Sequence, residues 1–202
     1  VARKADSKRA DALQRMGIQG LGFYSEERRV SPQGSVGAHV LGYAGVDNKG
    51  LSGLELALNE TLAGRPGHET VVRDPFGRAL DILKATPAVE GRDVRLTLDA
   101  TLQANAESIL RSTVRRWGAL AATAVVLDPH SGEVLALAVE PGFDANRFPQ
   151  TSREVQRNRA VTDTYEPGST LQVATVAEAL SAGLASPTTQ ITLAPTIQVA
   201  DR

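Results

Sequence analysis

The chain has 202 residues, enough for one large or two small domains, and 42% of them are hydrophobic, which is enough for a packed core. The formal net charge of −1 gives no electrostatic reason to expect binding to nucleic acid or to an anionic membrane surface. Cysteine is absent, which fits a protein outside the cytoplasm, and every apolar run is shorter than the ~20 residues of a transmembrane helix. Because the chain begins with Val1 and stops at Arg202 without a closing element, we expect it to be a piece of a longer protein.

The first part of the chain contains short helical stretches that end at glycines. Apolar spacing and capping residues predict helices over 7–16, 36–41 and 54–62. Asp6 or Ser7 is expected to cap the first helix, and Gly42 and Gly64 follow the second and the third. No strand is followed by Gly-x-Gly-x-x-Gly, so the glycines indicate turns and helix ends, and no phosphate-binding loop is predicted.

A β-hairpin is predicted after these helices. Two β-like runs, 69–74 and 79–83, are joined by a Pro-Phe-Gly-Arg turn over 75–78. The polar stretch 84–92 follows, and its proline and glycine make it the best candidate for a domain boundary. We therefore expect one domain over 1–90 and a second over 91–202.

The second domain is expected to combine helices with an antiparallel sheet. Period-two alternation predicts a strand over 93–98, and Asp99 is expected to cap a helix over 100–117. Strands over 122–127 and 133–139 enclose a tight turn and predict a second hairpin, which would leave an unpaired sheet edge. The fold class predicted for the chain is α+β. The core stripe expected on the long helix consists of Leu102, Ala106, Ile109, Leu110 and Val114.

The segment Tyr-Glu-Pro-Gly-Ser-Thr-Leu-Gln, residues 165–172, opens an apolar helix. Ser169 or Thr170 is expected to cap this helix, which is apolar on nearly every face and should therefore be buried. Gly183 is expected to end it, with Leu184 packing back as in a Schellman motif. A serine after Pro-Gly is in most cases only an N-cap, but a hydroxyl at the positive end of a helix is also where a nucleophile gains from backbone N–H donors.

This segment resembles the active-site segment of the penicillin-binding proteins, in which Ser-x-x-Lys opens the central helix of the transpeptidase domain. The resemblance makes Ser169 the position of the nucleophile and puts Gln172 where the family has Lys. Residues three apart share a helix face, so a Lys there would lie beside the hydroxyl and, with its pKa lowered by burial, could take the serine proton. Gln172 can orient the hydroxyl, but it has no titratable group.

Residues 29–67 resemble the N-terminal pedestal, or dimerisation, domain of class B penicillin-binding proteins. Ser31 stands where that family usually has Tyr. The resemblance implies that Arg29 and Glu55 are polar anchors, and we expect a buried or half-buried ion pair between them. Further segments, including 96–99 and 128–133, resemble the start of the transpeptidase domain, so the resemblance covers nearly the whole chain. The residues of the pedestal motif singled out here are Arg29, Pro32, Gly42, Gly53 and Glu55.

The resemblance implies a pedestal domain followed by the N-terminal part of a serine-transpeptidase domain from bacterial cell-wall synthesis, in cell division or in the control of cell shape. The family reaction is acyl transfer between peptidoglycan stem peptides, and β-lactams acylate the same serine. Implied partners are stem peptides, β-lactams and a membrane-bound glycosyltransferase. The implied location is outside the cytoplasmic membrane, anchored by an N-terminal helix absent from this chain. No cofactor or metal is expected, because the three histidines are scattered without metal-ligand spacing.

Gln172 keeps a second hypothesis open, in which the chain belongs to a non-catalytic scaffold that uses its pedestal to bind partners. The family's later motifs, Ser-x-Asn and Lys-Thr-Gly, do not occur in these residues, so the chain as given is expected to be inactive. A free β-lactamase is disfavoured, because those enzymes have no such pedestal and need the Lys.

Overall fold

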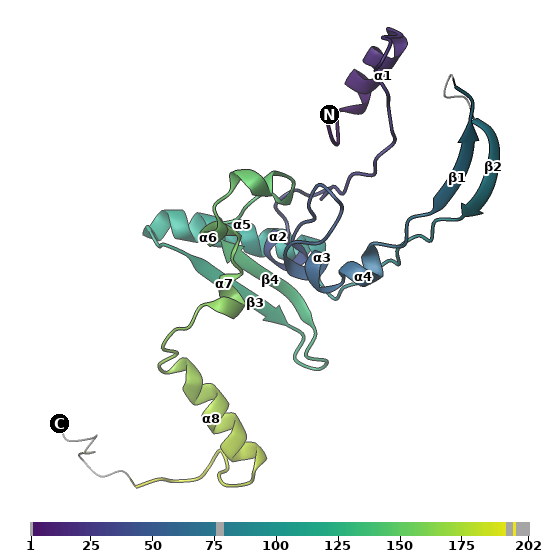
Figure 1. Ribbon diagram of the computed structural model, residues 1–202. Helices are drawn as coiled ribbons and strands as arrows, with labels where there is room; N and C mark the ends of the chain where they lie inside the picture. Colours follow the sequence, from purple (N-terminus) through teal and green to yellow (C-terminus); the bar gives the residue numbers. More distant parts are fainter. Residues whose placement is uncertain (1, 76–78, 193–195, 197–202) are drawn as a thin grey trace. The chain divides into compact units, whose positions relative to one another are not determined.

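The computed structural model describes residues 2–75, 79–192 and 196, which form two compact units, Val1–Thr162 and Asp163–Arg202. The first unit contains the helices α1 to α7, a 3-10 helix and two antiparallel hairpins (Figure 1). The second unit contains the helix α8, Thr170–Ser181. The mixture of helices and antiparallel strands confirms the α+β class predicted from the sequence.

The helix α5, Ala100–Trp117, packs across the hairpin formed by β3, Ala122–Leu127, and β4, Val134–Glu140 (Figure 1). The Asp99 side chain accepts a hydrogen bond from the Leu102 N–H, so it caps the helix as predicted. The predicted core stripe is only partly right, because Ile109 is 63% exposed. The most buried side chains of α5 are instead two polar ones, Gln103 and Glu107.

The strand predicted over 93–98 is wrong, because this segment has no regular secondary structure. Only its end lies along β4, where the Thr97 hydroxyl donates to the Val134 carbonyl and the Asp99 N–H donates to the Leu135 carbonyl. Two such bonds are too few for a strand ladder. They still cover part of β4 on the side away from β3, so the unpaired edge that we expected does not extend along the whole hairpin.

The pedestal part of the first unit is built from three short helices, α2 Ala38–Leu41, α3 Gly53–Ala57 and α4 Asn59–Leu62. The single helix predicted over 54–62 is therefore two helices. They are interrupted at Leu58, whose φ of −108° and ψ of 18° lie outside the helical region. The predicted helix stop at Gly42 is confirmed, since Gly42 is the C-cap of α2.

The first hairpin consists of β1, His68–Arg73, and β2, Ala79–Thr86, in antiparallel register with His68 opposite Thr86. Residues 76–78 of the predicted turn lie outside the described residues. The stretch predicted as a polar connector, 84–92, is hydrogen-bonded to the preceding chain. Its first three residues belong to β2, Val89 exchanges two backbone hydrogen bonds with Arg65, and the Arg92 N–H donates to the Thr61 carbonyl. The proposed boundary near residue 90 thus falls in a hydrogen-bonded segment.

The hydrophobic core joins residues that are about a hundred positions apart in the chain. Ala38 of α2 packs with Phe143 and Ala145, and the partly buried rings of Tyr43 and Phe148 cover this cluster. The segment that returns the chain to the pedestal contains the 3-10 helix η1 Ala145–Gln150, α6 Arg153–Gln156 and α7 Arg159–Thr162. Pedestal and hairpin therefore share one core within the first unit.

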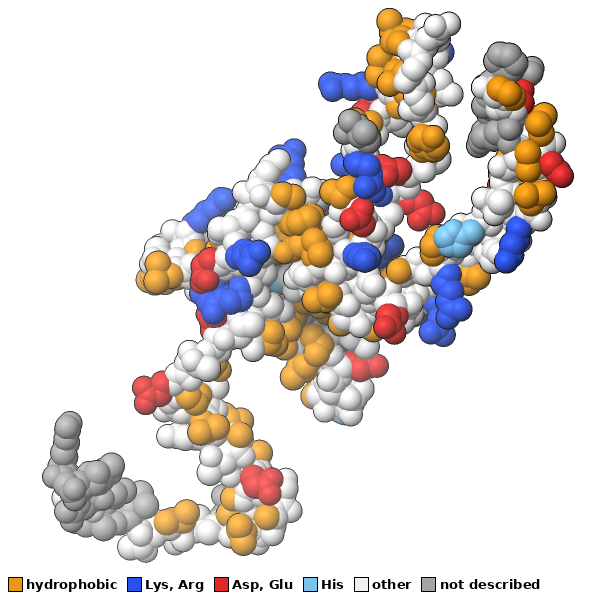
Figure 2. All heavy atoms as spheres, in the orientation of Figure 1, with side chains coloured by type: hydrophobic (Ala, Val, Ile, Leu, Met, Phe, Trp, Pro, Cys, Tyr) orange, Lys and Arg blue, Asp and Glu red, His pale blue; other side chains and the backbone are white. Residues whose placement is uncertain are grey.

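The helix α1, Ser7–Arg15, begins with the cap predicted at Asp6, whose side chain accepts from the Arg9 N–H. Large apolar side chains remain exposed at the end of α1 and on the first hairpin, among them the C-cap residue Met16 at 69% and Leu80 at 66% exposure (Figure 2). Among the described residues, none of the helices combines the length and the apolar character that crossing a membrane requires.

Candidate functional site

Ser169 occupies the N-cap position of α8 in the second unit, directly after Gly168 in a left-handed conformation with φ of 54°. The prediction that Ser169 or Thr170 caps the helix is confirmed in position, because Ser169 is the N-cap residue, but its hydroxyl does not make the capping hydrogen bond that we expected. The helix begins instead with tight backbone turns, in which the Thr170, Leu171 and Gln172 N–H groups donate to carbonyls three residues back, at distances of 3.1 to 3.2 Å. In the part of the chain that the structure describes, the Ser169 hydroxyl makes no hydrogen bond.

Gln172 lies one helical turn after Ser169 and on the same face of α8. The two residues line a shallow, open hollow together with Val173, Val176, Ala177 and Leu180. Among the described residues, no hydrogen bond joins the Gln172 amide to the Ser169 hydroxyl. The geometry therefore has the shared face that Ser-x-x-Lys chemistry uses, with an amide in place of an amine.

The backbone at the far end of α8 closes at Gly183 as the sequence predicts, but the prediction that Leu184 packs back on the helix is wrong, because Leu184 is 81% exposed. The Leu184 N–H donates to the Ala179 carbonyl at 2.9 Å and the Gly183 N–H donates to the Leu180 carbonyl at 3.1 Å, which is the Schellman pattern. The expectation that α8 is buried is wrong for this chain, since none of its residues is buried. An apolar helix is buried only where other elements present a matching surface, and α8 is the single regular element among the described residues of its unit.

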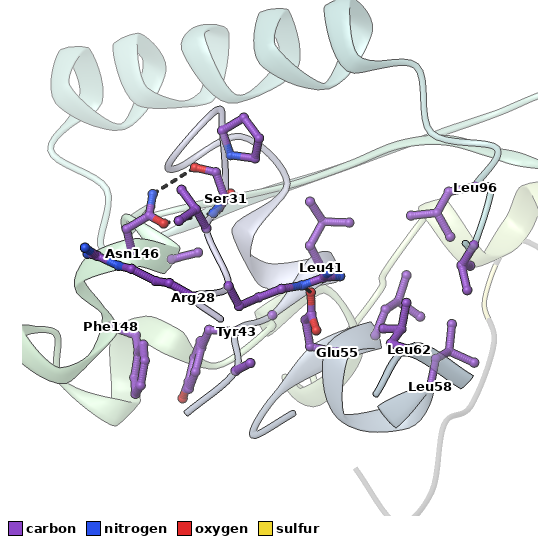
Figure 3. Close-up of a pocket in the computed structure, with 18 residues that line it drawn as sticks. Arg28, Ser31, Leu41, Tyr43, Glu55, Leu58, Leu62, Leu96, Asn146 and Phe148 are labelled. Atoms are coloured by element: carbon purple, nitrogen blue, oxygen red, sulfur yellow. Dashed lines mark hydrogen bonds and ion pairs between the residues drawn. The ribbon is translucent and has the colours of Figure 1, made fainter. Parts of the chain in front are cut away.

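A second hollow, which we call the pedestal pocket, lies in the first unit and has a volume of about 290 Å³ (Figure 3). Its wall is formed by the segment Arg28 to Pro32, by side chains of α2, α3 and α4, by the segment around Leu96 and by η1. In Figure 3 leucines gather at one end, while Tyr43, Phe148 and Asn146 stand at the other. The pocket is therefore apolar at one end and polar and aromatic at the other.

The Arg29–Glu55 ion pair expected from the sequence is present at the rim of this pocket. Arg29 Nε lies 2.7 Å from Glu55 Oε1, and the Glu55 side chain is 19% exposed, whereas that of Arg29 is 52% exposed. Only the carboxylate is thus half-buried. An ion pair with one exposed partner contributes about 1 kcal/mol or less to stability, so its main effect is to hold the 28–32 segment against α3.

The glycines of the pedestal motif, Gly42 and Gly53, are in direct backbone contact. A Cβ atom added at Gly42 would lie 1.9 Å from the Ser52 carbonyl oxygen, and one added at Gly53 would lie 2.5 Å from the Val40 carbonyl oxygen. Both residues also have positive φ, 76° and 57°. Any side chain at either position would push α2 and α3 apart, whereas Pro32 lines the pedestal pocket directly.

Three buried polar residues were missed by the sequence-based prediction. Glu107 Oε1 accepts from the Gly37 N–H and from the Gln103 amide, both at 2.8 Å. The His39 Nε2 donates to the Val155 carbonyl at 2.8 Å. Burial lowers the pKa of His39. The bond to Val155 and the nearby Glu107 and Glu140 carboxylates partly offset this decrease. The only available signal was the position of Gln103 and Glu107 four residues apart on one face of α5.

Among the described residues, no group of His, Asp and Glu side chains is arranged to hold a metal ion. The fold is α+β, and Ser169 and Gln172 share a helix face at the spacing that resembles the active-site segment of penicillin-binding proteins. Comparison with known proteins agrees with this resemblance. Residues 1–96 match the family "Penicillin-binding Protein dimerisation domain", and residues 122–202 match the family "Penicillin binding protein transpeptidase domain".

The chain is similar to whole proteins of the same type. It is 40% identical over 186 residues to the probable peptidoglycan D,D-transpeptidase PenA of Neisseria gonorrhoeae, which covers 91% of this chain and 32% of that protein. It is 34% identical over 184 residues to the peptidoglycan D,D-transpeptidase FtsI of Escherichia coli, covering 91% of this chain and 31% of FtsI. A solved peptidoglycan synthetase from Bifidobacterium adolescentis superposes with a TM-score of 0.72 at 27% identity, over 95% of this chain and 35% of that one.

The chain belongs to the penicillin-binding protein family. It carries the dimerisation domain and the first part of the transpeptidase domain. It spans about a third of the length of the relatives that it matches.

Proposed function

We propose that this chain provides the pedestal and the beginning of the catalytic domain of a peptidoglycan D,D-transpeptidase. The supporting evidence is the order of the two family matches along the chain and the D,D-transpeptidase names of its relatives. The reaction is acyl transfer: a serine attacks the D-Ala-D-Ala bond of a stem peptide, and the acyl group then passes to the amine of a neighbouring stem. Penicillins acylate the same serine.

Ser169 is the nucleophile in this proposal, and the shared helix face of Ser169 and Gln172 is the single observation that carries the assignment. Ser169 lies at the N-terminus of α8, where the helix dipole stabilises negative charge. In the tetrahedral intermediate the oxyanion would accept a hydrogen bond from the Ser169 backbone N–H. The hydroxyl makes no capping bond that would have to be broken before attack.

Gln172 cannot act as the general base that the reaction requires. A neutral amine at this position could accept the hydroxyl proton, whereas the Gln172 amide cannot, and a positioned general base contributes about a hundred- to ten-thousand-fold to the rate. The Ser-x-Asn and Lys-Thr-Gly motifs do not occur in these 202 residues either. The chain as given therefore forms no acyl-enzyme at a useful rate.

A second candidate function is a non-catalytic scaffold that keeps the pedestal for partner binding. Gln172 is the observation that favours it, because loss of the base removes catalysis without disturbing the pedestal core. In either case the protein would act outside the cytoplasmic membrane, held there by an N-terminal membrane helix, next to a membrane-bound glycosyltransferase that supplies glycan strands. The resemblance to the family supports these placements.

Covalent labelling by a fluorescent penicillin, read on denaturing gels, tests the assignment. In the 202-residue chain neither the unmodified form nor Gln172→Lys should be labelled, because the Lys-Thr-Gly strand is missing. In a longer protein that carries both later motifs, Gln172→Lys should raise the acylation rate by about a hundred-fold or more, and Ser169→Ala should abolish labelling.

Gln172→Met is the matched control, because it has a similar length but no basic group. It should leave labelling of the longer protein as slow as it is with Gln172. Labelling of the unmodified longer protein as fast as that of the Lys variant would mean that another group activates the serine. Labelling that persists in Ser169→Ala would show that Ser169 is not the nucleophile.

A further inference from the structure

The apolar end of the pedestal pocket leaves aliphatic surface accessible to water in a concave site. Leu41, Leu54, Leu58 and Leu62 line it, and each is only partly buried. Covering a leucine side chain fully is worth about 1.5–3 kcal/mol, so this surface favours an occupant that brings an aliphatic group. A concave apolar site of this kind is typical of ligand or peptide binding.

The other end of the pocket carries a positive charge without a partner. Arg28 lines the pocket, and in Figure 3 its side chain extends toward Asn146, away from the leucines. Two other charged side chains of residues 26–29 are paired, Arg29 with Glu55 and Glu26 with Arg3. Among the described residues, Arg28 alone of these arginines has no ion pair or hydrogen bond. A carboxylate is the complementary group, since guanidinium binds carboxylates with two parallel hydrogen bonds.

Between these two ends runs an extended stretch of backbone with free hydrogen-bonding groups. Residues 28–30 contain no helix or turn and belong to no strand of the described sheets. In the part of the chain that the structure describes, none of their N–H or C=O groups has a hydrogen-bond partner. A peptide in an extended conformation can pair with such a segment as an added strand, which provides affinity from the backbone while side chains enter pockets on one side.

The walls of the pocket are fixed before anything binds. The Asn146 amide exchanges two hydrogen bonds with the Ser31 backbone, at 2.9 Å from the Ser31 N–H and 2.8 Å to the Ser31 carbonyl. The rings of Tyr43 and Phe148 stack with centroids 3.9 Å apart, and the Tyr43 hydroxyl donates to the Gln156 side chain. A preformed pocket loses little conformational entropy on binding.

We propose that the pedestal pocket docks an extended peptide segment of a partner protein, with an aliphatic side chain in the leucine end and an acidic side chain on Arg28. The peptide backbone pairs with residues 28–30. This docking is independent of the chemistry at Ser169, so it holds for a catalytic protein and for a scaffold alike.

Selection of phage-displayed random octapeptides on the immobilised 202-residue chain tests the proposal. The enriched peptides should share an aliphatic residue close to an acidic one. Fluorescein-labelled copies should then bind in fluorescence anisotropy, with affinity about tenfold lower for Arg28→Ala. Arg9→Ala, which removes an exposed arginine of α1 outside the pocket, should leave the affinity unchanged.

Two further variants separate the pocket from the rest of the surface. Ser31→Trp places a ring in the pocket. Because Asn146 bonds only to the Ser31 backbone, this variant should keep these bonds. It should abolish peptide binding while the circular dichroism spectrum stays unchanged. Arg28→Glu is exposed and should fold normally, and selection on it should enrich lysine or arginine in place of the acidic residue. Failure to enrich any peptide above uncoated wells, or equal binding to the Ser31→Trp variant, would overturn the proposal. So would a dimer in sedimentation equilibrium that Ser31→Trp dissociates, because the occupant would then be a second copy of the chain.

Discussion

The side-chain amide of Gln103 makes two hydrogen bonds to the edge of β4, of the kind that a neighbouring strand would make. Removing this amide should destabilise the first unit strongly. Gln103 Oε1 accepts from the Leu137 N–H at 2.8 Å, and Gln103 Nε2 donates to the Leu137 carbonyl at 2.9 Å. The same nitrogen lies 2.8 Å from Glu107 Oε1, which also holds the Gly37 N–H at the start of α2. One side chain, 2% exposed, therefore connects α5 to the hairpin and, through Glu107, to the pedestal.

The cost of Gln103→Ala follows from these contacts. The substitution leaves the N–H and the C=O of Leu137 without partners and takes one of two donors from a buried carboxylate, and each such loss costs about 1–3 kcal/mol when the group stays dry. Leu137 is only partly buried, so water replaces part of the loss. The expected decrease in the free energy of unfolding is about 3–5 kcal/mol, which is large against a typical domain stability of about 5–15 kcal/mol.

Urea unfolding followed by circular dichroism, together with amide hydrogen exchange at Leu137, measures this effect. Gln103→Met keeps the side-chain volume and removes only the hydrogen bonds, so it should lose most of the same stability and expose the Leu137 amide to exchange. Asn105→Ala is the control, an exposed amide on the same helix, and should change stability by only about 0.6 kcal/mol. A Gln103→Met variant within about 1 kcal/mol of the parent, with the Leu137 amide still protected, would refute this reasoning.

Three further predictions concern the pedestal, a buried histidine and the link between the units. Gly42→Ala should lower the free energy of unfolding, measured in urea titrations, by about 3 kcal/mol or more, because the added Cβ would lie 1.9 Å from the Ser52 carbonyl oxygen. A loss below about 1 kcal/mol would contradict the close contact of α2 and α3. Burial lowers the pKa of His39 in the folded state below its ordinary 6.5, so the unfolded chain binds more protons and stability should fall as the pH drops below about 6.5. His39→Gln should flatten that dependence in unfolding midpoints taken from about pH 7.5 to 5.5, whereas an unchanged slope would assign it to other groups. Limited proteolysis should cut first within residues 163–168, at the junction of the two compact units. If the first cleavage instead falls within 84–92, the hydrogen bonds from Val89 and Arg92 do not protect that segment.

The sequence alone determined the local elements that depend on caps and periodicity. Asp6, Asp99 and the Schellman close at Gly183 stand where the sequence predicted them, and so do both antiparallel hairpins. These features depend on a few neighbouring residues, whose side chains and backbone preferences act within one or two turns. The segment around Ser169 indicated the family together with the pedestal motifs and the segments at the start of the transpeptidase domain, because each of these motifs is contiguous in the chain.

Only the tertiary structure decided which side chains are buried and which polar groups meet. Ile109 points to water while Gln103 and Glu107 fill the buried face of α5, and the segment 93–98 stays irregular despite its alternating pattern. The pedestal pocket likewise combines residues from near positions 30, 55, 95 and 146, a grouping that no local pattern encodes. The physical reason is that a buried amide or carboxylate is favourable only where a distant backbone group supplies its partner, and the partners of Gln103 and Glu107 lie at Leu137 and Gly37.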